Sequence, residues 1–263
     1  MARVRLDHLL TERGLYASRS RAAAAVIAGD VKLGPGRRRA EKPGQLVAAD
    51  VEIDVTAPPP YVSRGGIKLA NALDLLRVPV AGRACLDVGA STGGFTDCLL
   101  QRGAAHVVAL DVAYGELALA VRDDARVTVM ERVNARSLDP GSLPYAPELV
   151  VADVSFISLT KVLPAVLAAC APRFDALVMV KPQFEVGRER IGKGGVVTDP
   201  ALRREAIAAV ASAARSLGAS VLGFAPSGLP GPAGNRETFA WLGEGGRAGA
   251  VEDLERAVAA VDA

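Results

Sequence analysis

Two charged side chains follow apolar stretches directly and are candidates for chemistry. Asp153 comes after Val150-Val151-Ala152, and Lys181 comes after Met179-Val180. If both stretches are parallel strands, the two side chains meet at the sheet edge where open α/β proteins bind ligands. A charge at the end of a buried strand needs a partner or a function. The pair is therefore either a structural ion pair or part of a reaction centre, in which the lysine acts as a base toward a weakly acidic hydroxyl such as a ribose 2′-hydroxyl.

A loop of small residues is the second candidate site. It follows residues 84–88 and reads Gly89-Ala90-Ser91-Thr92-Gly93-Gly94-Phe95, and glycines there allow a ligand to approach the backbone closely. The dinucleotide fingerprint G-x-G-x-x-G is not matched, because Ser91 stands at its third position. Asp87 can place a positively charged amino group, and Asp111, at the end of the next strand, can accept both hydroxyls of a ribose. We expect this loop to bind a cofactor; the alternative is a purely structural turn.

The elements that position these residues follow from the apolar pattern. Continuous apolar stretches alternate with helical segments from residue 84 onward, which is typical of a parallel sheet covered on both faces. The fold class is therefore α/β, with a doubly wound, Rossmann-like domain. The predicted strands are residues 84–88, 106–110, 127–130, 149–152, 176–180 and 220–224, with a last strand at 238–241 and helices at 67–76 and 251–261.

The N-terminal part has a different organisation. Leu6, Leu9 and Leu10 have helical spacing, and Ser18 can cap a second helix that ends at Gly29. Short strands are expected at residues 31–33 and 51–55, so this part is a small α+β domain. Three consecutive prolines at 58–60 suggest a stiff linker. We place the domains at residues 1–58 and 67–263, with a linker at 59–66.

Charge is distributed unevenly along the chain. Residues 1–44 contain ten Lys and Arg against four Asp and Glu, a net charge of +6, whereas the whole chain carries +2. This asymmetry points to a polyanionic partner of the N-terminal domain. No apolar segment is long enough for a signal peptide or membrane span, and the three cysteines have no metal-like spacing. We expect a cytoplasmic monomer with no metal and no membrane contact.

Four residues and their surroundings resemble a known family. Lys68, Asp153, Lys181 and Glu237 look like the K-D-K-E tetrad of the FtsJ-type RNA 2′-O-methyltransferases. The glycine loop, Asp153-Val154-Ser155-Phe156 and Lys181-Pro182-Gln183-Phe184-Glu185 extend the likeness to the TlyA family, also called hemolysin A, over nearly the full length. The N-terminal domain is similar to an S4 RNA-binding domain.

The resemblance implies a reaction and its site residues. It implies S-adenosylmethionine as cofactor and ribosomal RNA as partner, with cytidine 2′-hydroxyls methylated in both subunit RNAs. Lys181 would be the central catalytic residue, Asp153 and Glu237 would orient it, and Lys68 would help hold the ribose. Expected cofactor residues are Asp87, Gly89, Ala90, Ser91, Thr92, Gly93, Gly94, Phe95, Asp111, Asn134 and Asp153. Expected RNA-binding residues are Arg3, Arg5, Arg19, Arg21, Lys42 and Arg64.

Four alternatives remain at this point. A ribosome-assembly factor that only binds would have lost the tetrad, which is intact here. A membrane-active hemolysin would need an apolar or amphipathic insertion segment, and none is evident. A nicotinamide oxidoreductase lacks its fingerprint. Methyl transfer to a small molecule is disfavoured by the basic N-terminal domain.

Overall fold

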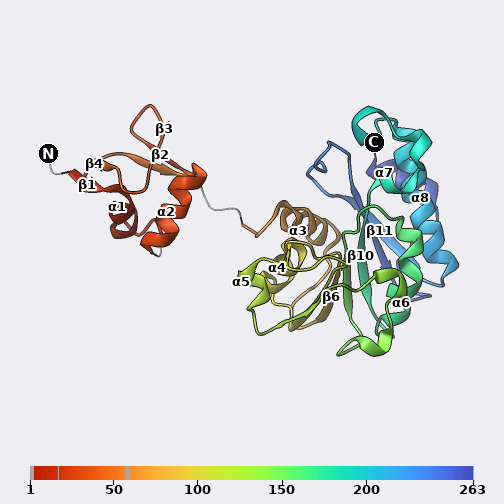
Figure 1. Ribbon diagram of the computed structural model, residues 1–263. Coiled ribbons are helices and arrows are strands. Elements are labelled where there is room, and N and C mark those ends of the chain that lie inside the picture. The colour runs from red at the N-terminus through yellow and green to blue at the C-terminus, as the bar shows by residue number, and fades with distance from the viewer. Residues whose placement is uncertain (1–2, 17, 57–59, 263) are drawn as a thin grey trace. The chain divides into compact units, whose positions relative to one another are not determined.

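The computed structural model describes residues 3–16, 18–56 and 60–262, and the chain forms two compact units, Met1–Pro60 and Tyr61–Ala263 (Figure 1). The prolines at 58 and 59 lie outside the described residues. The helix expected at residue 67 begins earlier, at Arg64, so the last residues of the expected linker form its first turn. Gly66 is required there, because a Cβ atom would lie 2.4 Å from Tyr61.

The first unit combines two helices with two small antiparallel sheets. One sheet pairs β1 with β4, and the other has the order β3-β2-β5. Ser18 caps the second helix as predicted, since its Oγ accepts a hydrogen bond from the amide of Arg21, and Gly29 ends that helix at φ 92°. The elements are β1 (Arg3–Arg5), α1 (Leu6–Glu12), α2 (Arg19–Ala28), β2 (Val31–Leu33), β3 (Arg38–Arg39), β4 (Leu46–Ala48) and β5 (Ile53–Val55).

The second unit is built on a seven-stranded sheet with the order β11-β12-β10-β9-β6-β7-β8. Its strands are β6 (Ala84–Val88), β7 (His106–Leu110), β8 (Val127–Met130), β9 (Leu149–Ala152), β10 (Asp175–Val180), β11 (Ser220–Pro226) and β12 (Thr238–Gly243). Its helices are α3 (Arg64–Leu76), α4 (Gly94–Gln101), α5 (Leu119–Arg122), α6 (Leu163–Ala169), α7 (Pro182–Glu185), α8 (Pro200–Ser216) and α9 (Leu254–Val261).

Both faces of this sheet are covered, which explains the continuous apolar strands. Successive residues of β10 alternate between two cores: Val178 packs in the core under α6 and α8, and Met179 packs in the core under α3 and α4. Figure 1 shows these two helix layers on opposite sides of the sheet. None of the helices in the described part of the chain combines the length and the apolar composition that a membrane crossing requires.

The expected all-parallel sheet is wrong at one strand. The five strands from β10 to β8 are mutually parallel, but β12 lies antiparallel between β10 and β11. In this register Val180, at the end of β10, pairs with Thr238, at the start of β12. An antiparallel strand begins at the edge where parallel strands end, so the residue before β12 reaches the same edge as the residue after β10.

Candidate active site

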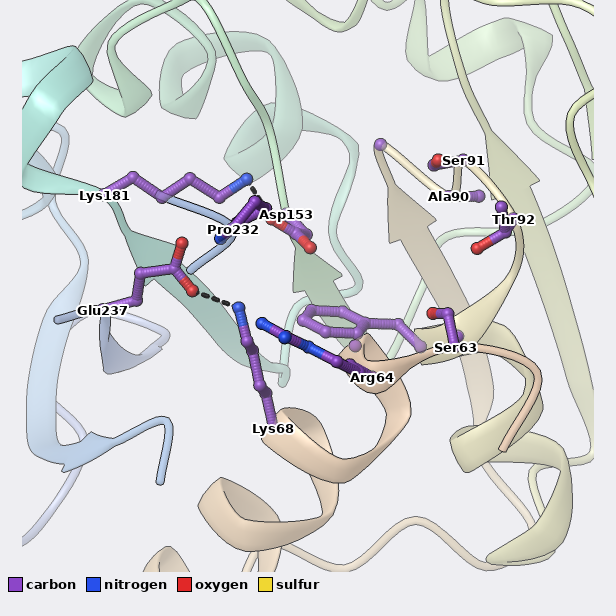
Figure 2. Close-up of a pocket in the computed structure, with 14 residues that line it drawn as sticks. Ser63, Arg64, Lys68, Ala90, Ser91, Thr92, Asp153, Lys181, Pro232 and Glu237 are labelled. Atoms are coloured by element: carbon purple, nitrogen blue, oxygen red, sulfur yellow. Dashed lines mark hydrogen bonds and ion pairs between the residues drawn. The ribbon is translucent and has the colours of Figure 1, made fainter. Parts of the chain in front are cut away.

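Four charged side chains meet in one cavity at the carboxyl edge of the parallel strands (Figure 2). Lys68 comes from α3, Asp153 follows β9, Lys181 follows β10 and Glu237 precedes β12. They form two ion pairs, Lys68 with Glu237 and Lys181 with Asp153. The cavity has a volume of about 480 Å³, within the range of about 300–1,000 Å³ that is common for ligand pockets.

The two ion pairs differ in exposure. Lys68 and Glu237 are nearly closed off, with side chains 7% and 1% exposed, whereas those of Lys181 and Asp153 are 11% and 26% exposed. Because two buried charges hold each other in place, the first pair ties α3 to β12 across the floor of the cavity. The second pair is the one open to an arriving molecule.

The amine of Lys181 is held by two oxygen atoms. Its Nζ lies 2.5 Å from Asp153 Oδ1 and donates a hydrogen bond of 2.8 Å to Ser155 Oγ. The contact with Asp153 is close but poorly aligned, since Oδ1 has no hydrogen bond of acceptable angle among the described residues. Asp153 and Ser155 together hold the amine at the cavity.

The glycine loop separates this cavity from a second one of about 350 Å³, and Gly89, Ser91 and Asp153 line both. Gly89 has a φ of 84°, and a Cβ atom there would lie 2.6 Å from the backbone oxygen of Asp153. The loop therefore lies directly against the end of β9. Asp111 anchors the loop, because its Oδ2 accepts a hydrogen bond of 2.7 Å from the Ser91 amide.

The second cavity has polar and apolar walls. Asp111 and Asn134 line it together with Leu110, Val133 and Ile157. Asn134 also shapes its own turn, since its Oδ1 accepts a hydrogen bond of 3.0 Å from the Arg136 amide. A carboxylate and an amide beside aliphatic side chains suit a nucleoside, because the sugar is polar and the faces of the base are not.

The residues expected to bind cofactor fall into three groups. In the described part of the chain, Asp87 and Gly93 line neither cavity. Asp111 and Asn134 line the second cavity, and Asp153 lines both, as Gly89 and Ser91 do. The first cavity is lined by Gly89, Ala90, Ser91, Thr92, Gly94 and Phe95.

Asp87 lies behind the loop rather than in it. It is fully buried, and its Oδ2 accepts a hydrogen bond of 2.7 Å from Thr96 of α4. Burial raises the pKa of Asp87 to about 7, although the hydrogen bond from Thr96 opposes this. In this position Asp87 joins β6 to α4, and its Oδ1 has no hydrogen-bond partner among the described residues. Its contact with an amino group stays a prediction.

Two residues outside the sequence-based set hold the centre together. Ser155 receives the hydrogen bond from Lys181 described above. Glu185, at the end of α7, accepts hydrogen bonds from Ser158 Oγ at 2.5 Å and from the Leu159 amide at 2.9 Å, and burial raises its pKa. Its carboxylate thereby links the segment that carries Asp153 to the segment that carries Lys181. The motifs in which both residues lie were the only signal for them in the sequence.

The expected RNA-binding residues are not equivalent. In the first unit, Arg5 and Arg19 both bind Asp7, which is buried, and hydrogen bonding by Arg5, with a further contribution from Arg19, lowers the pKa of Asp7. Arg3, Arg21 and Lys42 are exposed, and the described residues provide no partner for their side chains. In the second unit, Arg64 lines the first cavity and donates to the backbone oxygen of Pro230.

Comparisons with known proteins identify a family and several relatives. The FtsJ-like methyltransferase family model matches residues 61–244. The 16S/23S rRNA (cytidine-2′-O)-methyltransferase TlyA of Mycobacterium tuberculosis is 50% identical, covering 91% of this chain and 90% of that protein. YqxC of Bacillus subtilis, described as a candidate rRNA methyltransferase, is 43% identical over 92% of this chain and 87% of that protein. A solved structure from Streptococcus thermophilus, described as a candidate hemolysin, is 36% identical with a TM-score of 0.73, covering 99% of this chain and 96% of that one.

Proposed function

This chain belongs to the FtsJ-like methyltransferase family and, within it, to the TlyA family, and we propose that it methylates cytidine 2′-hydroxyls of ribosomal RNA with S-adenosylmethionine. The observation that carries the proposal is the meeting of the Lys68–Glu237 and Lys181–Asp153 pairs in one cavity beside the glycine loop. Relatives whose names state rRNA cytidine-2′-O-methylation support the substrate.

The donor set fits S-adenosylmethionine. Asp111 and Asn134 would hold its nucleoside, and the loop around Gly89 would lie between that end and the tetrad. Gly89 lines both cavities, and its lack of a Cβ lets the loop lie directly against the backbone of Asp153. The bound cofactor supplies a methyl group already activated as a sulfonium, so the protein has to align the acceptor oxygen and remove its proton.

Lys181 removes that proton in the proposed mechanism. Its amine is held at the cavity by Asp153 and Ser155, within reach of a ribose hydroxyl that occupies the cavity. S-adenosylmethionine would supply the methyl group, and Lys181 Nζ would accept the proton of the 2′-hydroxyl that takes it. Lys68, fixed by Glu237, helps to position the ribose.

The first unit, in this proposal, is an S4-like RNA-binding domain. Arg3, Arg21 and Lys42 are exposed and without partners among the described residues, so they are the most available for phosphate contacts. Arg5 and Arg19 are held in place by Asp7 while their side chains stay 53% and 55% exposed. Such arginines can bind phosphate with less loss of conformational freedom. We propose that the protein acts as a monomer in the cytoplasm, where its ribosomal substrate is found.

Transfer of labelled methyl from S-adenosylmethionine to purified ribosomal subunits and their RNA tests the proposal. Lys181→Ala should abolish transfer while cofactor binding persists, and the product should map to a ribose 2′ position. Lys161→Ala is the matched control, because it removes an exposed lysine on the same unit. Label that persists at the same nucleotide in Lys181→Ala would remove the lysine from the mechanism. If the wild-type protein labels no RNA, the alternative of an assembly factor that only binds RNA would be favoured.

A further inference from the structure

Two adjoining cavities lie on the far side of the loop that carries Glu237. They have volumes of about 510 and 460 Å³, and both are lined by Gly234, Arg236 and Asp262. Glu237 lines the larger of the two as well as the catalytic cavity, whereas Arg203 and Arg204 line the smaller. We call these two the arginine cavities. They extend from the wall of the catalytic site to the start of α8.

The carboxylates around the arginine cavities already form ion pairs with other side chains. Glu237 binds Lys68, and the buried Asp262 binds the Nε of Arg203 at 2.9 Å. Glu205, next to Arg204 in α8, binds Arg190. The acidic side chains here are therefore balanced by other cations and have little capacity left to neutralise a further arginine.

Arg204 and Arg236 carry the unbalanced charge. Within the described residues, neither side chain has an ion pair or a hydrogen bond, although both line the smaller cavity. The first turn of α8 has no acidic residue beyond its cap Asp199, which is bound to the Ala201 amide. The Asp199 carboxylate offsets the positive end of the helix dipole there, so the positive potential comes from the two arginines. Uncompensated arginines in a cavity are suited to an anion.

We propose that the arginine cavities bind the sugar-phosphate backbone of the RNA strand next to the nucleotide being methylated. The inference rests on the proposed function. A strand whose target ribose lies in the catalytic cavity passes Glu237, and the arginine cavities begin on the other side of that residue. Arginine at successive points along such a path binds successive phosphates independently of base sequence. Arg236 contacts the phosphate nearer the target, and Arg204 contacts one further along the strand.

The test measures binding to purified ribosomal RNA at several salt concentrations for wild type, Arg204→Ala, Arg236→Ala and the double variant. Each variant should bind about 10-fold more weakly, as expected for one lost charge-assisted hydrogen bond. Each should also make the slope of log affinity against log salt concentration less steep by about 0.7, the value for one phosphate on a single strand. Affinity for S-adenosylmethionine should stay unchanged, which also shows that the fold is intact.

Arg77→Ala is the matched control. Arg77 is an exposed arginine at the C-terminal end of α3 that lines neither arginine cavity, so its loss changes the net charge by the same amount as either single variant. If each single variant has the same affinity and salt slope as Arg77→Ala, the inference is overturned. A loss seen only with intact subunits, and not with naked RNA, would assign the surface to an acidic protein and overturn it as well. If the wild-type protein binds RNA through these arginines but transfers no methyl group, the proposed function is wrong and this inference about RNA binding still holds.

Discussion

Removing either member of the Lys68–Glu237 pair should destabilise the second unit strongly, and removing both should not. Lys68→Met leaves a carboxylate with 1% side-chain exposure without its cation, and Glu237→Leu leaves an ammonium with 7% exposure without its anion. Breaking a buried pair costs about 3–5 kcal/mol, whereas replacing both members by apolar residues of similar size is often neutral. Both side chains also line a cavity, so we expect the lower end, about 3 kcal/mol, for each single variant.

The chain provides its own probe for this experiment. Its single tryptophan, Trp241, lies in β12 four residues after Glu237, so tryptophan fluorescence reports unfolding of the second unit alone. A loss of about 3 kcal/mol in a unit of this size lowers the melting temperature by roughly 6–12 °C. The double variant Lys68→Met/Glu237→Leu should melt within a few degrees of wild type.

Methyl transfer measured on the same four proteins separates stability from chemistry. The double variant should be stable yet inactive, because it keeps the packing but lacks the two charges at the ribose. Single variants that lose less than about 1 kcal/mol, as exposed pairs do, would refute the reasoning that this pair is desolvated. A double variant as unstable as the singles would show that the cost comes from packing and not from an unpaired charge.

Two further predictions concern the glycine loop and the carboxylate behind it. Gly89→Ala should weaken S-adenosylmethionine binding at least about 10-fold. Gly82→Ala is the control and should not weaken it, because Gly82 also has a positive φ but has open space around it. Equal affinities of the two variants in a calorimetric titration would contradict this prediction. The pKa of Asp87 is raised from 3.8 to about 7 in the folded state, so the stability that this group contributes is present at low pH and is lost as the pH rises toward 7. Asp87→Asn should remove that decline in the free energy of unfolding between about pH 4 and 7. An identical pH dependence in wild type and variant would show that Asp87 does not titrate there.

Parallel strands and their ends could be predicted from the sequence because both are local properties. A continuous apolar stretch signals a strand buried on two faces, and the residue after it lies at the ligand-binding edge. This places Asp153 and Lys181 at the same edge of the sheet, and the pairing of β9 with β10 makes them neighbours. The glycine loop after β6 follows from the same logic.

The position of Glu237 depended on the tertiary structure. Its strand looks like any other apolar strand in the sequence, and only its insertion antiparallel between β10 and β11 turns its first residues toward Lys181. The resemblance to a known family pointed to Glu237, but the strand direction is the physical reason for its position. Strand order and direction arise from pairings between distant segments, so local patterns do not encode them.

Partners of charged side chains were likewise decided only by folding. The sequence alone predicted basic residues in the N-terminal unit and a functional carboxylate at Asp87. The structure joins Arg5 and Arg19 to Asp7 and places Asp87 against Thr96. Residue type and spacing thus determined which elements form and which chemistry is available. Burial and partner, which set the charge state of a carboxylate and its access to a ligand, depend on contacts made only after the chain has packed.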